Sequence, residues 1–445
     1  MIDLAKSSFV SPARLAAFEI LMRVEEGAYA SVLLNARASE LGPLDRALCH
    51  ELVMGVLRWQ LWLDRLAAIY SRREPSELDS AVRVILRLGL YQLRFLNRVP
   101  DSAAVNESVN LVKHARLRSA SGLVNAVLRR ATRETEVDPA HNIDDPIERL
   151  AVETSHPLWL IDRWCKSFGL DEAGQFARAN NEAAPVAFRV VKTRAEGSAI
   201  LDQLRQAGGL IEPSQIARDA WRIRGATQSL ASLAAQGCVY IQDEASQLVA
   251  EALNAQPGDK VLDLCAAPGS KTTQIADASG ATVIGSDVHE HRLRALKTSV
   301  NLQGLTNVSL LTLNGLNPLP FLDETFDCVL VDAPCSGTGT LRRNPEIRWR
   351  ISPGDIESLS QRQGVLLQNA SRAVKPGGRL VYSTCSVEIE ENEAIRQSFL
   401  KANSSFSSTD LGIQSAVASA GDVARTWPHK VGTDGFFLAS FKRDD

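Results

Sequence analysis

The sequence predicts three regions in order along the chain: a bundle of helices, a small α/β domain, and a doubly wound α/β domain with a mostly parallel sheet. The length of 445 residues allows about three domains at roughly 150 residues each. Apolar residues recur at helical spacing up to residue 133, whereas after residue 239 short apolar runs alternate with turns and helical stretches. These two patterns place the bundle first and the parallel sheet last.

Helical spacing dominates residues 1–135, the first predicted domain. Ser11 and Pro12 fit an N-cap and a first helical turn, Gly27 follows the first helix, and Pro100 ends a later one. Apolar residues repeat every three or four positions at Leu48, Leu52, Val56, Trp59, Leu63 and Leu66, at Val82, Leu86, Leu90 and Leu93, and at Leu123, Val127 and Leu128. We therefore predict an all-helical bundle of roughly five to seven helices.

The middle of the chain mixes both patterns. Residues 134–146 are polar and acidic and contain two prolines, as linkers do. Residues 158–168 and 198–206 have helical spacing, and residues 186–191 form a short apolar run typical of a strand. We predict a small α/β connecting domain over residues 145–238.

Residues 239–445 repeat the order strand, turn, helix. The predicted strands are residues 260–264, 282–286, 308–313, 328–331 and 379–383. In a sheet of this kind, ligands bind at the carboxyl ends of the strands, where the strand order reverses. The loops after these strands are therefore the candidate site.

Composition excludes several classes of protein. No apolar stretch reaches the ~18 residues of a membrane span, and the first residues lack a signal-peptide pattern, so we expect a cytoplasmic protein without a membrane partner. The seven cysteines form no C-x-x-C pair, which argues against a disulfide framework and a thiolate zinc site. His289 and His291 lie two positions apart and would not share a helix face. We expect no metal.

Basic residues concentrate near the end of the predicted bundle. Residues 83–133 contain ten Lys and Arg against two Asp and Glu. The excess of arginine favours a surface that binds phosphates, because the planar guanidinium pairs with phosphate oxygens bidentately. The alternative is a solvated helix face whose acidic partners come from elsewhere in the fold. The candidate RNA-binding residues of this stretch are Arg83, Arg87, Arg94 and Arg98.

The first strand of the C-terminal domain leads into a loop of small residues, 263–272, that opens a helix. The loop lacks the G-x-G-x-x-G pattern of dinucleotide-binding turns, which disfavours NAD and FAD. Asp287 ends the next strand, where a carboxylate accepts hydrogen bonds from ribose hydroxyls. A nucleoside without a pyrophosphate fits these two loops best, and we expect S-adenosylmethionine (SAM).

Two cysteines follow neighbouring strands of the predicted sheet. Cys335 lies in the sequence Asp-Ala-Pro-Cys after the fourth strand, and Cys385 lies in Ser-Thr-Cys-Ser after the fifth. Cys335 stands where amino-group methylases have an aromatic residue, so methylation of an amine is disfavoured. Carbon 5 of a pyrimidine becomes nucleophilic only when a thiolate adds to carbon 6, and a second thiolate can later remove the carbon 5 proton. Spacing does not decide which cysteine has which role.

The charges near Cys385 do not by themselves favour a thiolate. Glu388, Glu390 and Glu391 follow it and would raise a thiol pKa. A helix that begins near Val387 would favour the thiolate, and we expect the three acids to occupy the first turn of that helix. Lys271 is a candidate cation beside Asp332.

These motifs resemble those of the RNA cytosine-5 methyltransferases, which implies a Rossmann-like, SAM-dependent domain. The resemblance covers residues 263–272, Asp332 to Gly339 with Arg342 to Pro345, and Ser383 to Ser386 with Glu390 to Asn392. It implies that Cys385 is the nucleophile, that Cys335 acts in product release, and that Asp332 lies between the cofactor and the cytosine ring. The SAM-binding residues that it implies are Cys265, Ala266, Ala267, Pro268, Gly269, Ser270, Lys271, Asp287, Asn314 and Asp332. Asn314 stands where the family usually has Asp.

The predicted bundle resembles the NusB-type RNA-binding domain. The matching segments are Asp45-Arg46 with 55–58, 86–92, 104–107 and 124–129. Together the two resemblances identify the chain as a member of the bacterial RsmB/Sun (Fmu) family, which implies 16S ribosomal RNA as substrate. Arg342 and Arg343 are then further candidate RNA-binding residues, and we expect a monomer. A tRNA substrate, or an assembly factor that binds RNA without catalysis, are the alternatives.

Overall fold

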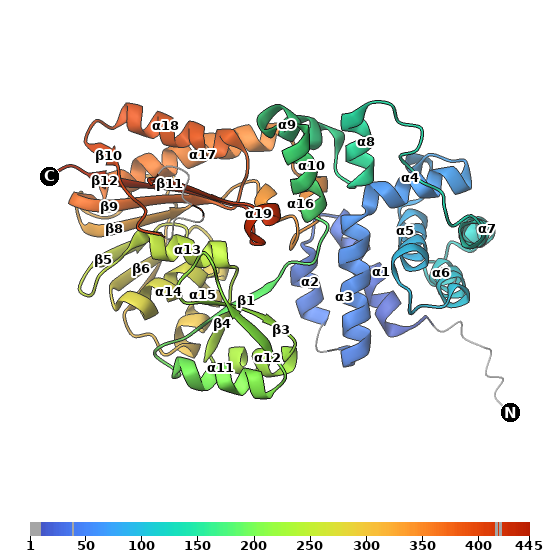
Figure 1. Ribbon diagram of the computed structural model, residues 1–445, viewed down its shortest axis with the longest axis horizontal. Coiled ribbons are helices and arrows are strands. Elements are labelled where there is room, and N and C mark those ends of the chain that lie inside the picture. Colours follow the sequence, from blue (N-terminus) through green and yellow to red (C-terminus); the bar gives the residue numbers. More distant parts are fainter. Residues whose placement is uncertain (1–9, 38–39, 414–416, 418–420) are drawn as a thin grey trace. The chain divides into compact units, whose positions relative to one another are not determined.

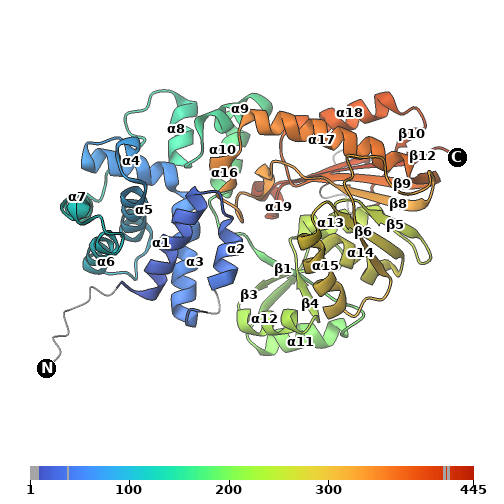
Figure 2. The same ribbon diagram turned by 180° about the vertical axis from the view of Figure 1, so that it is seen from behind.

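The computed structural model describes residues 10–37, 40–413, 417 and 421–445 (Figure 1 and, from behind, Figure 2). Contacts divide the chain into two units. The first contains the residues up to Glu182 together with Leu341–Arg350, and the second contains Ala183–Thr340 together with Ile351–Asp445.

Seven α-helices precede residue 134 within the described residues, as the apolar spacing predicts. They are α1 (Pro12–Glu25), α2 (Ala30–Arg37), α3 (Pro43–Arg58), α4 (Gln60–Ser71), α5 (Ser80–Phe95), α6 (Asp101–His114) and α7 (Ser121–Arg133). Ser11 is the N-cap of α1, and Gly27 has a φ of +107° just beyond its end. Buried leucines, valines and isoleucines from these helices form one continuous core.

Three more helices belong to this helical unit: α8 (Pro146–Glu153), α9 (Leu158–Phe168) and α10 (Leu170–Ala179). The contacts divide the chain between Glu182 and Ala183, and the domain start expected at residue 145 stays a prediction. Contacts with α4 explain the grouping, because the Leu61 N–H donates to Ser155 Oγ at 2.9 Å and Arg65 pairs with Glu148 at 3.3 Å.

The helical unit also contains a segment from much later in the chain. Leu341–Arg350, which includes α16 (Ile347–Arg350), is held there by buried polar side chains. The Arg348 guanidinium is fully buried and donates to Asn181 Oδ1 at 2.9 Å and to the Ser155 carbonyl at 3.1 Å. Glu346 accepts from the Ala30 N–H at 3.0 Å. Nothing in the spacing of the sequence predicts this placement.

The second unit begins with an antiparallel sheet of four strands in the order β2-β3-β1-β4. The strands are β1 (Val186–Val190), β2 (Leu210–Pro213), β3 (Ala220–Arg224) and β4 (Val239–Ile241), and α11 (Gly197–Gln206) and α12 (Thr227–Ala235) accompany them. Phe188 and Leu204 lie at the centre of a separate small core between sheet and helices. The small α/β region is thus present.

A larger sheet follows, with the strand order β10-β12-β9-β8-β5-β6-β7 and β11 paired to β12. The predicted strands are β5 (Lys260–Asp263), β6 (Thr282–Asp287), β7 (Val308–Thr312), β8 (Phe326–Asp332) and β9 (Val374–Thr384), all parallel to one another. Three strands that the sequence analysis did not predict extend the sheet: β10 (Phe406–Ser408), β11 (Val423–Thr426) and β12 (Phe436–Arg443). β12 runs antiparallel to β9.

Helices cover both faces of this sheet (Figures 1 and 2). Alternate residues of β5 show the arrangement, because Val261 packs with one core and Leu262 with the other. The first core includes α13 (Glu244–Leu253), α14 (Ser270–Ser279) and α15 (Glu290–Leu302), and the second includes α17 (Pro353–Arg372) and α18 (Glu393–Ala402). The sheet is therefore doubly wound, as predicted.

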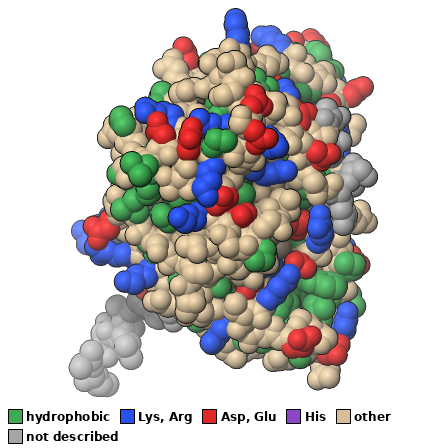
Figure 3. Space-filling view, turned by 90° about the vertical axis from the view of Figure 1, so that its left-hand side faces the viewer, with side chains coloured by type: hydrophobic (Ala, Val, Ile, Leu, Met, Phe, Trp, Pro, Cys, Tyr) green, Lys and Arg blue, Asp and Glu red, His purple; other side chains and the backbone are tan. Residues whose placement is uncertain are grey.

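Charges of both signs are interspersed on the face that Figure 3 shows. None of the described helices is both long and apolar enough to span a bilayer.

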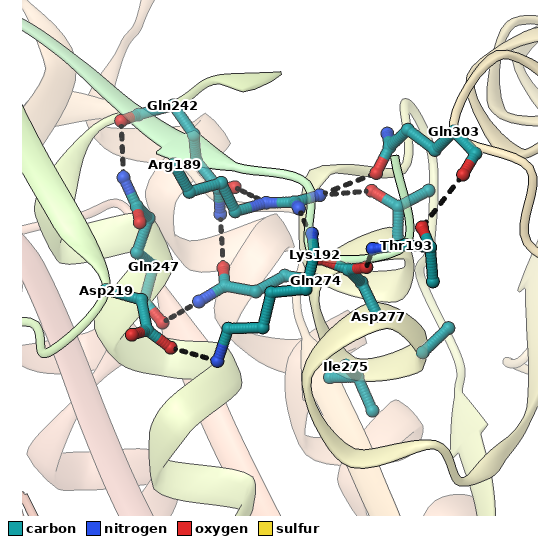
Figure 4. A network of polar contacts seen from close by, with 12 residues as sticks. Arg189, Lys192, Thr193, Asp219, Gln242, Gln247, Gln274, Ile275, Asp277 and Gln303 are labelled. Carbon is teal, nitrogen blue, oxygen red and sulfur yellow. Dashed lines mark hydrogen bonds and ion pairs between the residues drawn. The ribbon is translucent and has the colours of Figure 1, made fainter. Parts of the chain in front are cut away.

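A buried arginine joins the two sheets of the second unit (Figure 4). Arg189 of β1 donates to Thr273 Oγ1 of α14 at 2.9 Å and to Gln303 Oε1 at 3.0 Å, and its guanidinium lies 3.5 Å from Asp277. Asp277 also accepts from the backbone N–H groups of Lys192 and Thr193. Burial lowers the pKa of Arg189 to about 10, and Asp277 opposes that shift. The network therefore fixes the small sheet against α14.

Candidate active site

The candidate site lies where the order of the parallel strands reverses. β5 has β6 on one side and β8 on the other, so the chain leaves β5 and β8 in loops on the same edge of the sheet. Asp332, at the end of β8, is paired in register with Ser383 of β9. The loops after β8 and β9 are therefore neighbours.

The two predicted cysteines meet at this edge. The Sγ atoms of Cys335 and Cys385 are 3.3 Å apart, within hydrogen-bond distance for sulfur. Both side chains are partly buried. The Gly339 N–H donates to the Cys385 carbonyl at 3.0 Å, and a Cβ at residue 339 would lie 2.0 Å from the Gly435 carbonyl oxygen. Only glycine allows the Cys335 loop to approach this closely.

The environment of Cys335 favours its neutral thiol. Its pKa is raised well above the usual value by the hydrogen bond with Cys385, by burial, and by the nearby charges of Cys385 and Glu391. Cys335 is therefore a thiol in the resting site.

A buried ion pair lies beside the thiols. Lys271 Nζ is 2.7 Å from Asp332 Oδ2, while Ser383 Oγ donates to Asp332 Oδ1 at 2.7 Å. Burial disfavours the Lys271 ammonium, but Asp332, followed by Cys385 and Asp263, raises the Lys271 pKa above its usual value. Lys271 is thus a cation, and its partner Asp332 keeps a fixed orientation through Ser383.

A second carboxyl, Asp263 at the end of β5, is fully buried in the same region. Thr272 Oγ1 donates to its Oδ2 at 2.7 Å, and its Oδ1 has no hydrogen-bond partner among the described residues. Burial, which outweighs the opposing Thr272 hydrogen bond, raises the Asp263 pKa to about 7. The sequence analysis did not single out this residue.

The predicted cofactor residues surround the loop between β5 and α14. Gly269 is the N-cap of α14 with a φ of +115°, and a Cβ there would lie 2.2 Å from Leu296 Cδ1. Asp287 ends β6, is buried, and accepts the His289 N–H at 2.8 Å. The predicted loop residues are Cys265, Ala266, Ala267, Pro268, Gly269, Ser270 and Lys271.

This set of groups fits a ligand that carries a carboxylate and ribose hydroxyls. The N-terminus of α14 offers backbone N–H groups to an anion, and Asp287 offers a carboxylate to hydroxyls. Ala267 is half-buried and Pro268 is exposed, so the middle of this loop is open to a ligand. Asn314 follows β7 and is exposed, with its Oδ1 accepting the Leu316 N–H at 3.1 Å.

The structure corrects the expected surroundings of Cys385. No α-helix begins near Val387, because a short 3₁₀ turn, η4 (Ile389–Glu391), follows and α18 begins only at Glu393. Glu391 is fully buried and does not occupy a solvated first turn. A helix dipole at Val387 therefore does not act on Cys385.

The predicted RNA-binding arginines differ in their availability. Arg87 is buried and binds Asp64 and Glu25 at 2.7 Å, and Arg83 pairs with the same Glu25 at 3.2 Å. For these two the alternative holds, because their acidic partners come from α1 and α4. Arg94 donates to Tyr70 and to two carbonyls.

The other three candidate RNA-binding arginines lie on the bundle and on the late segment. Arg98 is exposed and makes no hydrogen bond or ion pair with a described residue. Arg342 is buried and Arg343 is half-buried, both in the segment that packs with the helical unit. Arg98 is therefore the most available guanidinium of the six.

The other five cysteines differ in burial. Cys49 and Cys328 are buried, whereas Cys165, Cys238 and Cys265 are half-buried. Within the described ranges no group of three His, Cys, Asp or Glu side chains is placed to hold a metal ion.

Three family models match successive parts of the chain. Residues 11–133 match the NusB family, residues 156–229 match the ferredoxin-like domain of the RsmF/B-like methyltransferases, and residues 250–442 match the family described as 16S rRNA methyltransferase RsmB/F. The order of the three matches follows the order of the predicted regions.

Whole-chain relatives agree. A probable ribosomal RNA small subunit methyltransferase B from Bacillus subtilis is 34% identical over 96% of this chain and 98% of the relative. The ribosomal RNA small subunit methyltransferase B of Pseudomonas putida is also 34% identical, over 96% of this chain and 97% of the relative.

Solved structures show the same architecture. The crystal structure of PH0851 matches with a TM-score of 0.84 and 27% identity, covering 98% of this chain and 99% of that one. A methyltransferase homologue from Pyrococcus horikoshii matches 68% of this chain and 100% of its own, with a TM-score of 0.60. The resemblance expected from the motifs is thus confirmed, and the chain belongs to the RsmB/F family of 16S ribosomal RNA methyltransferases.

Proposed function

We propose that this protein transfers a methyl group from SAM to carbon 5 of a cytosine in 16S ribosomal RNA, through a covalent adduct between a cysteine and carbon 6. The distance of 3.3 Å between Cys335 Sγ and Cys385 Sγ carries the proposal. Two sulfurs in contact can act in turn on adjacent carbons of one pyrimidine ring. A methylation that needs no covalent step would not require a second thiol there.

SAM would supply an electrophilic sulfonium methyl group. The residues proposed to hold it are those of the loop from Cys265 to Lys271, with Asp287 for the ribose, and with Asn314 and Asp332 nearby. The donor set described above fits an amino-acid nucleoside, and the chain's methyltransferase family requires a methyl donor.

In the proposed first step, the Cys385 sulfur bonds to carbon 6 of the cytosine, and the electron pair of the carbon 5–carbon 6 double bond becomes available at carbon 5. Lys271 lies close enough to Cys385 for their charges to interact, which places a positive charge near the attacking sulfur. Asp332, oriented by Lys271 and Ser383, hydrogen-bonds the ring.

In the proposed last step, carbon 5 bears both the new methyl group and its original proton. The Cys335 sulfur, once it has released its own proton to solvent, takes the carbon 5 proton. The electrons of that C–H bond re-form the double bond, and the bond from carbon 6 to Cys385 breaks. The products are the methylated cytosine, a Cys335 thiol and a free Cys385 thiolate.

The target base must leave its stack to meet the sulfurs, which is easiest in a loop or a non-canonical pair. We propose that the NusB-type unit grips nearby phosphates, with Arg98 and the half-buried Arg343 among the contacts. The relatives are named as small-subunit ribosomal RNA methyltransferases, which supports 16S ribosomal RNA rather than tRNA as substrate.

The test compares two cysteine variants with a third cysteine of the same unit as control. Cys385→Ala should abolish methylation and adduct formation. Cys335→Ala should accumulate an adduct between protein and RNA, visible as a band resistant to denaturant, and Cys238→Ala should behave as the wild type. Methylation by Cys385→Ala at the wild-type rate would overturn the role of Cys385.

The product identifies the substrate. Mass mapping of RNA from cells lacking the protein should show the loss of one 5-methylcytosine in 16S ribosomal RNA. Loss of the modification from tRNA instead would favour the tRNA alternative. Intact methylation in all RNA, together with failure of the purified protein to bind SAM in calorimetry, would favour an assembly factor.

A further inference from the structure

Glu391 is a fully buried carboxylate close to both cysteines. Its Oε1 accepts from the Ser336 N–H at 2.8 Å and from Gln363 Nε2 at 3.0 Å. Its Oε2 accepts from the hydroxyls of Ser336 and Ser386, each at 2.5 Å. Four donors satisfy one carboxylate, so the group is held in one orientation.

These donors belong to the two cysteine loops. Ser336 directly follows Cys335 after β8, and Ser386 directly follows Cys385 after β9. Gln363, from α17, completes the arrangement because it also donates to the Pro334 carbonyl at 2.9 Å, just before Cys335. Glu391 therefore bonds to both loops at positions adjacent to the sulfurs.

The buried charge of Glu391 has no cationic partner of its own among the described residues, since no Lys, Arg or His of these forms an ion pair with it. Glu391 contributes to the raised pKa of Cys335, whereas the cation Lys271 interacts with Cys385. Glu391 therefore disfavours the Cys335 thiolate, and Lys271 brings a positive charge to the same pair of sulfurs.

We propose that Glu391 is a positioning residue that holds the loops of Cys335 and Cys385 in register and places a negative charge beside Cys335. The inference rests on the proposed function, because it assigns a purpose to the contact between the sulfurs. Its test therefore starts from measurements on the free protein, which require neither RNA nor SAM.

Two variants separate the hydrogen bonds from the charge. In Glu391→Gln, the amide oxygen can accept from the Ser336 N–H and Gln363, and the amide nitrogen can donate to the serine hydroxyls, which rotate to accept. The loops then stay in place without the negative charge. Glu391→Ala removes both. Glu390→Gln, the exposed neighbour in the same turn, is the matched control, and thermal unfolding shows that each variant is folded.

The first readout is proximity. Diamide oxidises two nearby thiols to a disulfide and is itself reduced, and peptide mass spectrometry follows the Cys335–Cys385 product. Wild type, Glu391→Gln and Glu390→Gln should form it at similar rates, and Glu391→Ala should be slower by at least about tenfold, because an ångström-scale displacement costs on the order of 100-fold in a proximity-driven reaction. Equal rates in Glu391→Ala and wild type would overturn the positioning role.

The second readout is protonation. The pH midpoint for alkylation of Cys335 by iodoacetamide should move down in Glu391→Gln and remain at the wild-type value in Glu390→Gln. A merely structural role would leave this midpoint unchanged in Glu391→Gln, and an unchanged midpoint in that variant would overturn the electrostatic half of the proposal.

Turnover then separates this inference from the proposed function. If wild type methylates cytosine at carbon 5, Glu391→Ala should lose about 100-fold in kcat while SAM affinity in calorimetry stays within about twofold. If the wild type does not methylate carbon 5, the proposed function is overturned. The disulfide and alkylation measurements on the free protein then decide the role of Glu391 alone. Full turnover in Glu391→Ala would overturn the inference alone.

Discussion

Two groups of charged residues behave differently in this molecule. The abundance of arginine in residues 83–133 predicted a phosphate-binding surface, yet Arg87 of α5 is buried against Asp64 and Glu25. At the carboxyl edge of the large sheet, Lys271 was named as a candidate cation beside Asp332, and the two side chains form an ion pair of 2.7 Å. A count of charges does not say where their partners lie, whereas strand topology does.

The two groups also differ in how fully their charges are compensated. Arg87 has two carboxylates, and although burial opposes its charged form, Asp64 and Glu25 raise the Arg87 pKa above its usual value. Asp263, at the sheet edge, accepts a hydrogen bond from Thr272, and burial raises its pKa to about 7. The bundle uses its buried charge for stability, and the sheet edge retains groups that are poised to change protonation.

The sharpest test of this contrast is Arg87→Met. Removing the guanidinium leaves Asp64 and Glu25 without their shared partner, and breaking a buried pair costs about 3–5 kcal/mol. We expect urea denaturation to show a loss of that size for the helical unit, while RNA affinity of the folded protein is unchanged. Weaker RNA binding without a loss of stability would restore Arg87 to the RNA surface.

The second prediction concerns pH. Because the folded-state pKa of Asp263 lies near 7, above its usual 3.8, its contribution to stability is complete below about pH 4 and is lost as the pH rises through 7. Three pKa units correspond to at most about 4 kcal/mol. Asp263→Asn should flatten the dependence of the unfolding free energy on pH between 4 and 7. The same slope in wild type and variant would show that Asp263 ionises normally.

Lys271→Met tests the compensated pair at the sheet edge. The variant leaves Asp332 without its cation and removes the positive charge near Cys385, so we expect methylation to fall by about 100-fold, in the range of lost electrostatic stabilisation. Single-turnover assays at saturating RNA measure it. A variant in which only SAM affinity falls would place Lys271 in cofactor binding alone.

The smallest effect is expected at Arg98, which is the exposed member of the six candidate RNA-binding arginines. Arg98→Met should leave stability within about 0.5 kcal/mol, weaken RNA binding slightly, and reduce the slope of log affinity against log salt by about one contact. Together with Arg87→Met, it makes the same substitution at a paired and an unpaired arginine. An unchanged salt slope would remove Arg98 from the RNA surface.

Much of the fold follows from local pattern. A bundle of roughly five to seven helices and the strands β5 to β9 were predicted, because amphipathic helices and buried parallel strands leave strong periodic signals. β12 was missed because it pairs antiparallel to β9 and lies outside the repeat of strand, turn and helix. β10 and β11 have three and four residues, too few for a period to show.

The predicted site residues are those that directly follow the ends of strands. The contacts that the sequence did not reveal are those between side chains far apart along the chain. Cys335, Cys385 and Lys271 were named from spacing and resemblance. Glu391 was expected in a solvated helical turn, because an acid after a loop has the same local signature whether it faces water or two serines from different loops. The sequence feature that could have indicated the buried position of Glu391 is the serine that directly follows each cysteine, Ser336 and Ser386.

The segment Leu341–Arg350 has a practical consequence for any attempt to divide this protein. Three of its side chains form hydrogen bonds with the first 182 residues: Glu346, Arg348 and Trp349. A protein truncated after residue 182 would therefore lack these buried contacts. A synthetic decapeptide of that sequence, added in trans, should raise the melting temperature of such a truncated bundle. A domain boundary drawn from the order of the sequence alone would assign the segment Leu341–Arg350 to the second unit, although it packs with the first.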